Sequence, residues 1–342
     1  MKEYAKYVVV GAALLTVIAT DARSRDLIMA QTWSFDAIST GFLAAQDRGY
    51  FKENGVVVQV QRGIGASDTL RRLITGDVDF AVFDATLLVR AATADPQAQL
   101  TMIANILQRS SHTAIYVKGR NVKTVADLAK SRFGNTGGSV SQLFPTFMAY
   151  AMKSVGQPAD NYKSVQLDPA LRLPALLRGD VDVIAAFSFE MPLMAARARE
   201  SGLELAKFDF ADYGVNPYTY GVLVTRKFAE TNPDTVRGAV ASVLKGWQWV
   251  CQNPREAASF LAKYHADVPP ETIPEELSLF IPDVGGADVE AHGLGYMNPA
   301  RWEHTRVLSI AGFNLDEKLV PPVESLIDSK YLPQAPVRAS CK

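Results

Sequence analysis

The chain contains nearly the same phrase twice, and this duplication is the strongest constraint on its fold. The copy that begins at Leu73 reads LITGDVDF, and the copy that begins at Leu176 reads LLRGDVDV. Their separation is far longer than the roughly 20–50 residue period of a solenoid repeat. Each copy lies between an amphipathic helix pattern and an apolar run, so a glycine ends a helix and a buried strand follows. The duplication predicts two related α/β lobes.

Both copies belong to a unit in which a strand precedes a capped helix, a glycine stop and a second strand. In the first unit, β-branched alternation predicts a strand at 56–62, and Ser67 or Asp68 is expected to cap the helix that ends at Gly76. In the second unit, the expected strand is 162–167, and Asp168 is expected to cap the helix that ends at Gly179.

Two extended stretches, 113–119 and 218–228, are predicted to cross between the lobes. Lobe two would then comprise residues 118–217, inserted into a first lobe made of 23–117 and 218–342. The chain after residue 228 is predicted to be mainly helical, with helices at 233–252, 254–264, 299–311 and 317–329.

The N-terminus has the layout of a secretory signal peptide. Lys2 and Lys6 precede an apolar run over 7–19, and small residues follow up to Ala22. The run is shorter than the roughly 20 residues that span a bilayer. We therefore expect residues 1–22 to be removed and the mature protein to be soluble in the periplasm.

Composition excludes several classes of function. The 342 residues carry a formal net charge of −1, with Lys and Arg scattered and no basic stripe, so nucleic acid is not an expected partner. The four histidines are dispersed, and neither HExxH nor GxSxG occurs, so no enzyme, cofactor or metal site is predicted. The two cysteines, Cys251 and Cys341, either pair in the exported protein or remain unpaired.

Candidate binding residues follow the strands of both lobes. In open α/β sheets, ligands bind where strands end and helix N-termini present free N–H groups. Helix capping, turn formation or core packing also accounts for many of these residues individually. The candidate ligand-binding residues are Trp33, Asp36, Ser67, Asp84, Thr86, Gly138, Ser139, Phe187, Glu190, Tyr218 and Tyr220.

Three segments of the first lobe resemble the exported substrate-binding proteins of ABC importers. They are GYFKENG at 49–55, the Gly-Ser loop at 63–68 and LITGDVDFAV from Leu73. The similarity is to the branch for nitrate, sulfonate, taurine and thiamine-pyrimidine precursors. It implies a type II periplasmic-binding-protein fold, with two α/β lobes joined by two crossover strands around a ligand cleft. It also implies hinge closure on one small solute and delivery to an ABC permease, and a monomer is expected.

Charge favours one class of solute. The candidate loops carry Asp36, Asp84 and Glu190 but no Lys or Arg, and Arg109 is the nearest expected cation. Carboxylates accept hydrogen bonds from amino groups or ring N–H groups, and the aromatic candidates could stack on a flat ring. In thiamine-precursor binders a Trp and a Glu contact the pyrimidine, and Trp33 and Glu190 resemble them. An aminopyrimidine-like heterocycle is therefore the preferred solute.

Three alternatives remain open at the level of sequence. Helix-start donors such as those at 136–139 also hold anions, so a sulfonate, taurine, nitrate or aromatic carboxylate is the second choice of solute. Fungal pyrimidine synthases resemble this family but carry a cysteine-rich iron motif, which two distant cysteines cannot supply. A secreted sensory or interaction module is the third class.

Overall fold

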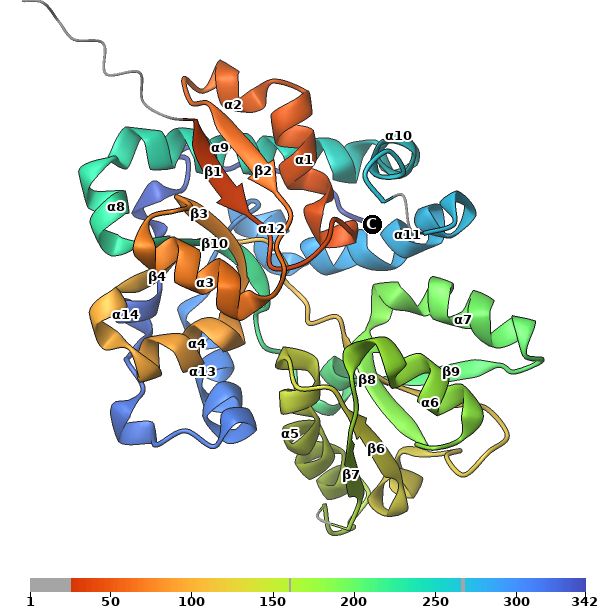
Figure 1. The fold of residues 1–342 in the computed structure, drawn as a ribbon. Helices are drawn as coiled ribbons and strands as arrows, with labels where there is room; N and C mark the ends of the chain where they lie inside the picture. The colour runs from red at the N-terminus through yellow and green to blue at the C-terminus, as the bar shows by residue number, and fades with distance from the viewer. Residues whose placement is uncertain (1–25, 160, 266–267) are drawn as a thin grey trace, which may run out of the picture.

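The computed structural model describes residues 26–159, 161–265 and 268–342, and it contains two five-stranded sheets (Figure 1). The predicted signal peptide lies outside the described residues. In spatial order, the first sheet is β2 (Val58–Gln61), β1 (Leu27–Ala30), β3 (Phe80–Asp84), β10 (Tyr220–Thr225) and β4 (Leu100–Asn105). The second is β7 (Lys163–Gln166), β6 (Arg132–Asn135), β8 (Val183–Phe187), β5 (His112–Val117) and β9 (Leu205–Asp209).

The two sheets follow one plan. In the first, β1 runs parallel to β2 and β3, while β10 runs antiparallel to both β3 and β4. In the second, β6 runs parallel to β7 and β8, while β5 runs antiparallel to both β8 and β9. The equivalent strands therefore occupy equivalent places, and the prediction of two α/β lobes from the repeated phrase is confirmed.

Helices cover both sheets, and those after β10 return to the first lobe (Figure 1). The first lobe begins with α1 (Thr40–Asp47), α2 (Tyr50–Glu53), α3 (Ala66–Thr75) and α4 (Ala85–Ala94). The second lobe has α5 (Ser139–Ser154), α6 (Arg172–Arg178) and α7 (Met191–Glu200). The C-terminal part has α8 (Arg226–Thr231), α9 (Pro233–Gln252), α10 (Pro254–Leu261), α11 (Ile273–Val284), α12 (Ala287–His292), α13 (Pro299–Phe313) and α14 (Val323–Leu326).

The repeated phrase has the same conformation in both lobes. Gly76 and Gly179 end α3 and α6 in the left-handed region, with φ of 78° and 82°, where a side chain would be strained. Asp168 caps the second unit as predicted, because its carboxylate accepts the backbone N–H of Ala170 at 2.8 Å. The predicted cap of the first unit is wrong, since Gly65 occupies that position and leaves Ser67 within α3.

The crossings lie earlier than the sequence indicated. Strand β5 pairs only within the second sheet, so residues 113–117 belong to lobe two, and the proposed boundary at 117 is displaced. The segments that join the sheets are 106–111 and 214–219. They lie side by side, since the backbone N–H of Ser110 donates to the side-chain oxygen of Asn216 at 2.8 Å.

The C-terminal helices agree with the sequence pattern at three of the four expected places. The helix expected at 317–329 is wrong: consecutive prolines at Pro321 and Pro322 interrupt it, and only a short 3₁₀ turn and α14 form. The sequence analysis also missed α11. This helix packs against lobe two near residues 188–190, and α13 packs against α5, so both helices bridge the lobes. Within the described ranges, no helix is long and apolar enough to cross a membrane.

The structure resolves the question of the cysteines. Cys251, at the end of α9, forms a disulfide with Cys341, which lies 90 residues later in the C-terminal tail. Both residues are buried in the core of the first lobe. The bond therefore holds the tail against the helices that cover the first sheet.

Removal of this bond is expected to destabilise the protein. The double variant Cys251→Ala, Cys341→Ala should unfold with a free energy lower by about 2–4 kcal/mol, because the unfolded chain is no longer closed into a long loop. Chemical denaturation of the variant, compared with the oxidised and the reduced parent protein, measures the effect. The reduced parent should match the variant, and equal stability of all three would contradict a stabilising disulfide.

Candidate functional site

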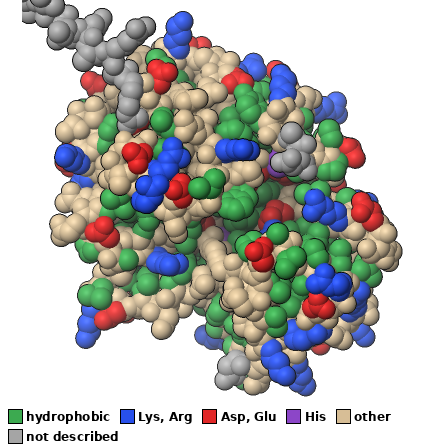
Figure 2. All heavy atoms as spheres, viewed as in Figure 1, with side chains coloured by type: hydrophobic (Ala, Val, Ile, Leu, Met, Phe, Trp, Pro, Cys, Tyr) green, Lys and Arg blue, Asp and Glu red, His purple; other side chains and the backbone are tan. Residues whose placement is uncertain are grey.

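A pocket of about 310 Å³ lies between the two lobes. Figure 2 shows the hollow on one face of the molecule, with hydrophobic and acidic side chains at its edge. The first lobe and its C-terminal helices provide one wall, and α6, α7 and the turn before α7 provide the other. The lining residues are Trp33, Ser34, Asp36, Pro169, Ala170, Arg172, Leu173, Pro174, Phe189, Glu190, Leu193, Met194, Arg197, His265, Val268 and Glu276.

The loop after β1 places Trp33 at the mouth of this pocket. Backbone N–H groups of Gly63 and Gly65 donate to the carbonyls of Trp33 and Thr32, each at 2.8 Å, so the loops after β1 and β2 are joined. A side chain at position 63 would collide with the carbonyl of Gln31, which explains the glycine. The Trp33 side chain is 60% exposed, which excludes the alternative that it belongs to the core.

Asp36 lies deeper in the pocket at the start of the 3₁₀ turn η1 (Ala37–Ser39). One carboxylate oxygen accepts the backbone N–H of Ile38 at 2.9 Å, and the Ser39 hydroxyl accepts that of Asp36. Burial and the nearby carboxylates of Glu276 and Glu190 together raise the pKa of Asp36 to about 7, although His265 and the hydrogen bond from Ile38 act in the opposite direction. Asp36 therefore changes charge near neutral pH.

Helix α11 brings a second acid to the same wall. Glu276 is only 5% exposed, and its Oε1 accepts the backbone N–H of Ala37 at 3.0 Å. Its Oε2 lies 3.5 Å from Nε2 of His265. Glu276 and His265 are not among the residues expected from the sequence. The segment IPEELSLFI at 273–281 carried a usable signal, namely a proline and two acids in a first turn followed by helical apolar spacing.

Glu190 lines the pocket from lobe two, but its carboxylate already has partners. Oε2 accepts the backbone N–H of Phe187 at 2.8 Å, and Oε1 forms an ion pair with Arg172. Arg172 and Arg197 also line the pocket. The expectation of a site without Lys or Arg is therefore wrong. Arg109 is not its nearest cation, because it lies at the crossing and pairs with Asp212 at 2.9 Å.

Aromatic rings from both lobes pack against one another beside the pocket. Phe187 stacks on Phe189 at 5.3 Å between ring centroids and lies 6.0 Å from Tyr220. Phe189 in turn meets Phe280 of α11 edge to face at 5.3 Å. Rings from both lobes thus pack against one another next to the pocket, and of these four rings Phe189 lines it. Phe187 and Tyr220 are expected binding residues.

Asp84, Thr86 and Ser139 form a buried group beside Tyr220. Oδ1 of Asp84 caps α4 by accepting the backbone and side-chain donors of Thr86 at 2.8 Å and 2.6 Å, whereas its buried Oδ2 lacks a hydrogen-bond partner. Burial raises the pKa of Asp84, and Thr86 and Ser139 act in the opposite direction. Ser139 belongs to the other lobe and follows Gly138, the residue that precedes α5.

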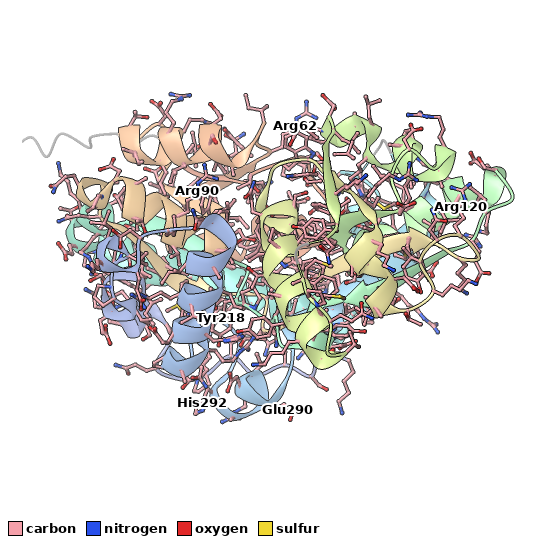
Figure 3. All side chains as sticks on the ribbon, turned by 90° about the horizontal axis from the view of Figure 1, so that it is seen from below. Arg62, Arg90, Arg120, Tyr218, Glu290 and His292 are labelled. Atoms are coloured by element: carbon pink, nitrogen blue, oxygen red, sulfur yellow. A yellow bond between two sulfur atoms is a disulfide. The ribbon has the colours of Figure 1, made fainter. Side chains whose placement is uncertain are left out.

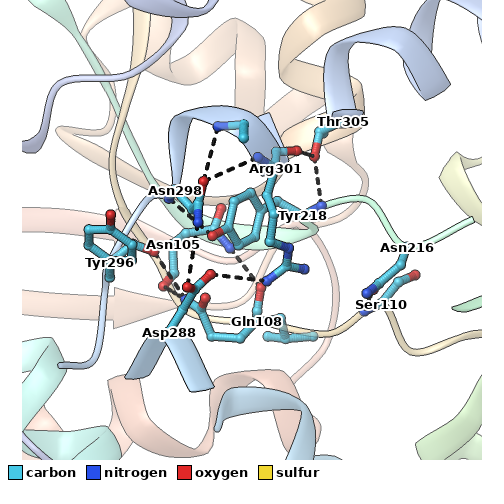
Figure 4. Close-up of polar contacts among 12 residues, drawn as sticks. Asn105, Gln108, Ser110, Asn216, Tyr218, Asp288, Tyr296, Asn298, Arg301 and Thr305 are labelled. Carbon is cyan, nitrogen blue, oxygen red and sulfur yellow. Dashed lines mark hydrogen bonds and ion pairs between the residues drawn. The ribbon is translucent and has the colours of Figure 1, made fainter. Parts of the chain in front are cut away.

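Two expected residues are not part of this arrangement. Ser67 is exposed in the first turn of α3, so its role remains a prediction. Tyr218 is fully buried. Figure 3 labels it next to the helix α13. Its ring packs against Trp302, with the guanidinium of Arg301 over it at 4.2 Å, and its hydroxyl accepts the backbone N–H of Asn298 (Figure 4). Tyr218 therefore lies outside the pocket lining, and its contact with a ligand remains a prediction.

Comparison with known proteins agrees with this geometry. A family described as "NMT1/THI5 like" matches residues 37–257, which is more than half of the chain. The chain belongs to the NMT1/THI5-like family. It is similar to the formylaminopyrimidine-binding protein of Halalkalibacterium halodurans (23% identical, 67% of each chain) and to the taurine-binding periplasmic protein of Escherichia coli (25% identical, 71% of this chain and 72% of the relative).

Solved structures of periplasmic binding proteins share the fold of this chain. The structure of the periplasmic aliphatic sulphonate binding protein of Escherichia coli superimposes with a TM-score of 0.67 and 18% identity, over 90% of this chain and 98% of the other. The type II periplasmic-binding-protein fold predicted from the sequence is thereby confirmed. The relatives named in these comparisons are binding proteins, and the chain shares their family or their fold.

The raised pKa of Asp36 predicts a pH-dependent stability. The folded state holds a proton that the unfolded state loses above the usual value of 3.8, so the free energy of unfolding should fall as pH rises from about 4 to about 7. Asn caps a helix as well as Asp does. Asp36→Asn should therefore be more stable than the parent at about pH 8, by about 1 kcal/mol or more.

Thermal and chemical unfolding between about pH 5 and about pH 8 test this expectation. Asp95→Asn is the matched control, because Asp95 makes the same kind of cap to Gln97 at an exposed site. The control should keep the pH dependence of the parent protein. If Asp36→Asn keeps it as well, Asp36 does not hold the proton.

Proposed function

We propose that this protein is exported to the periplasm, captures a small planar molecule with an amino group in the interlobe pocket, and delivers it to an ABC permease. An aminopyrimidine-like heterocycle is the preferred solute. The observation that carries the proposal is the pocket itself, where Trp33 and Phe189 are accompanied by three carboxylates, Asp36, Glu190 and Glu276. Rings stack on flat heterocycles, and carboxylates accept from amino and ring N–H groups.

The relatives support the class of solute without selecting one. Their names refer to a formylaminopyrimidine and to taurine, and both of these solutes carry nitrogen donors. The pocket volume of about 310 Å³ suits a small molecule. Bridging contacts of α11 and α13 with the second lobe are consistent with closure of the lobes about the crossings at 106–111 and 214–219.

An anionic solute such as a sulfonate, nitrate or an aromatic carboxylate is the second candidate. Arg172 and Arg197 on the lobe-two wall favour it, since guanidinium groups bind oxyanions well. However, Arg172 already pairs with Glu190 and also donates to the carbonyl of Ala185 at 3.3 Å. The charge available to an anion is correspondingly reduced, so this candidate ranks second.

Replacement of Trp33 tests whether the pocket stacks a ring. Trp33→Ala should leave the melting temperature nearly unchanged, because the side chain is exposed, and should weaken binding of 4-aminopyrimidine by about 1–3 kcal/mol. The other tryptophans are buried, so a fluorescence change on binding should be lost in this variant. A variant that binds as tightly as the parent would contradict stacking.

Glu190→Gln separates the two classes of solute. The change removes a carboxylate acceptor and leaves Arg172 without its partner charge. Binding of 4-aminopyrimidine should weaken by more than tenfold, about 1.4 kcal/mol, whereas ethanesulfonate should bind equally well or more tightly.

Titration calorimetry measures both affinities. Glu200→Gln is the control, because Glu200 lies exposed at the far end of α7 and is absent from the pocket lining. Tighter binding of ethanesulfonate together with unchanged binding of 4-aminopyrimidine would exclude the preferred solute and retain the solute-binding function.

A further inference from the structure

Asp36 and Glu276 lie on the lobe-one wall of the pocket and come from distant parts of the chain. Glu276 accepts the backbone N–H of Ala37, the residue that follows Asp36, so the two carboxylates are held as neighbours. Both line the pocket. Each also has a fixed hydrogen bond from backbone, which holds its orientation: Asp36 to Ile38 and Glu276 to Ala37. The pair is therefore built into the structure and is not a solvated surface cluster.

Charged groups from every neighbouring element face this pair. His265 lies against Glu276 on the same wall, at 3.5 Å. On the opposite wall Glu190 is paired with Arg172, and Arg197 stands at the exposed rim. Asp84 is buried and Tyr220 is partly buried, and in the described part of the chain the hydrogen-bond partners of Asp84 include no cation. The carboxylates of Glu276 and Glu190 thus act on Asp36. Of the two arginines that line the pocket, Arg172 is paired with Glu190 and Arg197 is exposed.

We propose that Asp36 and Glu276 form the subsite for a positively charged amino group of the solute, which binds in place of a proton. This inference rests on the proposed solute-binding function, but not on the choice between a heterocycle and an amino-sulfonate. In the binding step, the O–H bond of the carboxylic acid at Asp36 breaks and the proton passes to the solvent. The ammonium or amidinium N–H groups of the solute then donate to both carboxylates.

The electrostatic cost of the pair explains why a proton is present at all. Burial and the charges of Glu276 and Glu190 disfavour a second negative charge at Asp36, so its pKa rises to about 7. A cation between the two carboxylates offsets their repulsion. It also donates charge-assisted hydrogen bonds, which are stronger in a pocket that excludes water. A solute without a positive group gains nothing from the subsite.

Titration calorimetry of the protein without its expected signal peptide tests the subsite with three probes. 4-Amino-1-methylpyrimidinium carries a fixed positive charge, taurine carries an ammonium group, and ethanesulfonate lacks the amino group. The titrations use pairs of buffers that differ in protonation enthalpy, phosphate and imidazole at about pH 6, and Tris and Hepes at about pH 8.5. An amino probe that binds should release close to one proton at about pH 6 and almost none at about pH 8.5. As the pH is raised toward about 7, the affinity of the probe should increase by up to about tenfold per pH unit, and above about pH 7 it should level off.

Two variants and one control identify the groups. Glu276→Gln keeps the oxygen that accepts from Ala37 and should weaken the amino probe by about tenfold or more. Asp36→Asn should weaken it and abolish the proton release. Glu275→Gln is the matched control, since Glu275 is the exposed neighbour of Glu276 on α11. Binding of ethanesulfonate should not fall in any of the three.

The outcomes distinguish the subsite from the proposed function. Proton release with loss of amino-probe binding in both pocket variants supports the subsite. Binding of ethanesulfonate without binding of either amino probe overturns the subsite and retains a solute-binding protein. Amino-probe binding that Glu276→Gln leaves unchanged, or that releases no proton, also overturns the subsite. If none of the probes binds, both the subsite and the proposed solute classes are excluded.

Discussion

The cleft depends on how two short crossings are held, and Asp283 at the end of α11 holds the first of them. Its carbonyl accepts the backbone N–H groups of Gln108 and Arg109 at 2.7 Å and 3.0 Å, and its carboxylate accepts the hydroxyl of Ser111 at 2.7 Å. The carbonyl of Ser111 then accepts the backbone N–H of Ser188, at the start of the turn that carries Glu190. A chain of hydrogen bonds therefore joins the C-terminal helices of lobe one, the crossing and the pocket wall of lobe two.

Helix α11 connects this hinge to the pocket. Glu276 and Asp283 are seven residues apart, so both lie on the same buried face of the helix, one at the pocket and the other at the crossing. Phe280 lies between them on that face and packs against Phe189 of lobe two. A shift of α11 that accompanies solute binding at Glu276 would act directly on the hydrogen bonds of the crossing. The helix thus provides a continuous link between the pocket and the crossing.

The sequence predicted the architecture well because its signals were local. The glycines at 76 and 179 and the apolar runs after them define equivalent units without knowledge of tertiary contacts. The site was predicted in part, since Trp33, Asp36 and Glu190 follow strands and do line one pocket. The charge balance of the site could not be predicted, because it depends on tertiary contacts. Arg172 and Glu190 come from separate elements, and Glu276 contacts Ala37, which is 239 residues away in the sequence. Tyr218 precedes the first residue of β10 by two positions, so strand alternation did not govern its direction, and it packs into the core.

The buried acid Asp84 carries a cost in stability. Among the residues that the structure describes, its Oδ2 has no hydrogen-bond partner, a condition that usually costs on the order of 1–3 kcal/mol. Burial favours its neutral form and also raises the pKa of Tyr220, on which the charge of Asp84 acts. Ser139 of the second lobe acts against the rise in the pKa of Asp84, so this buried acid lies where the two lobes meet.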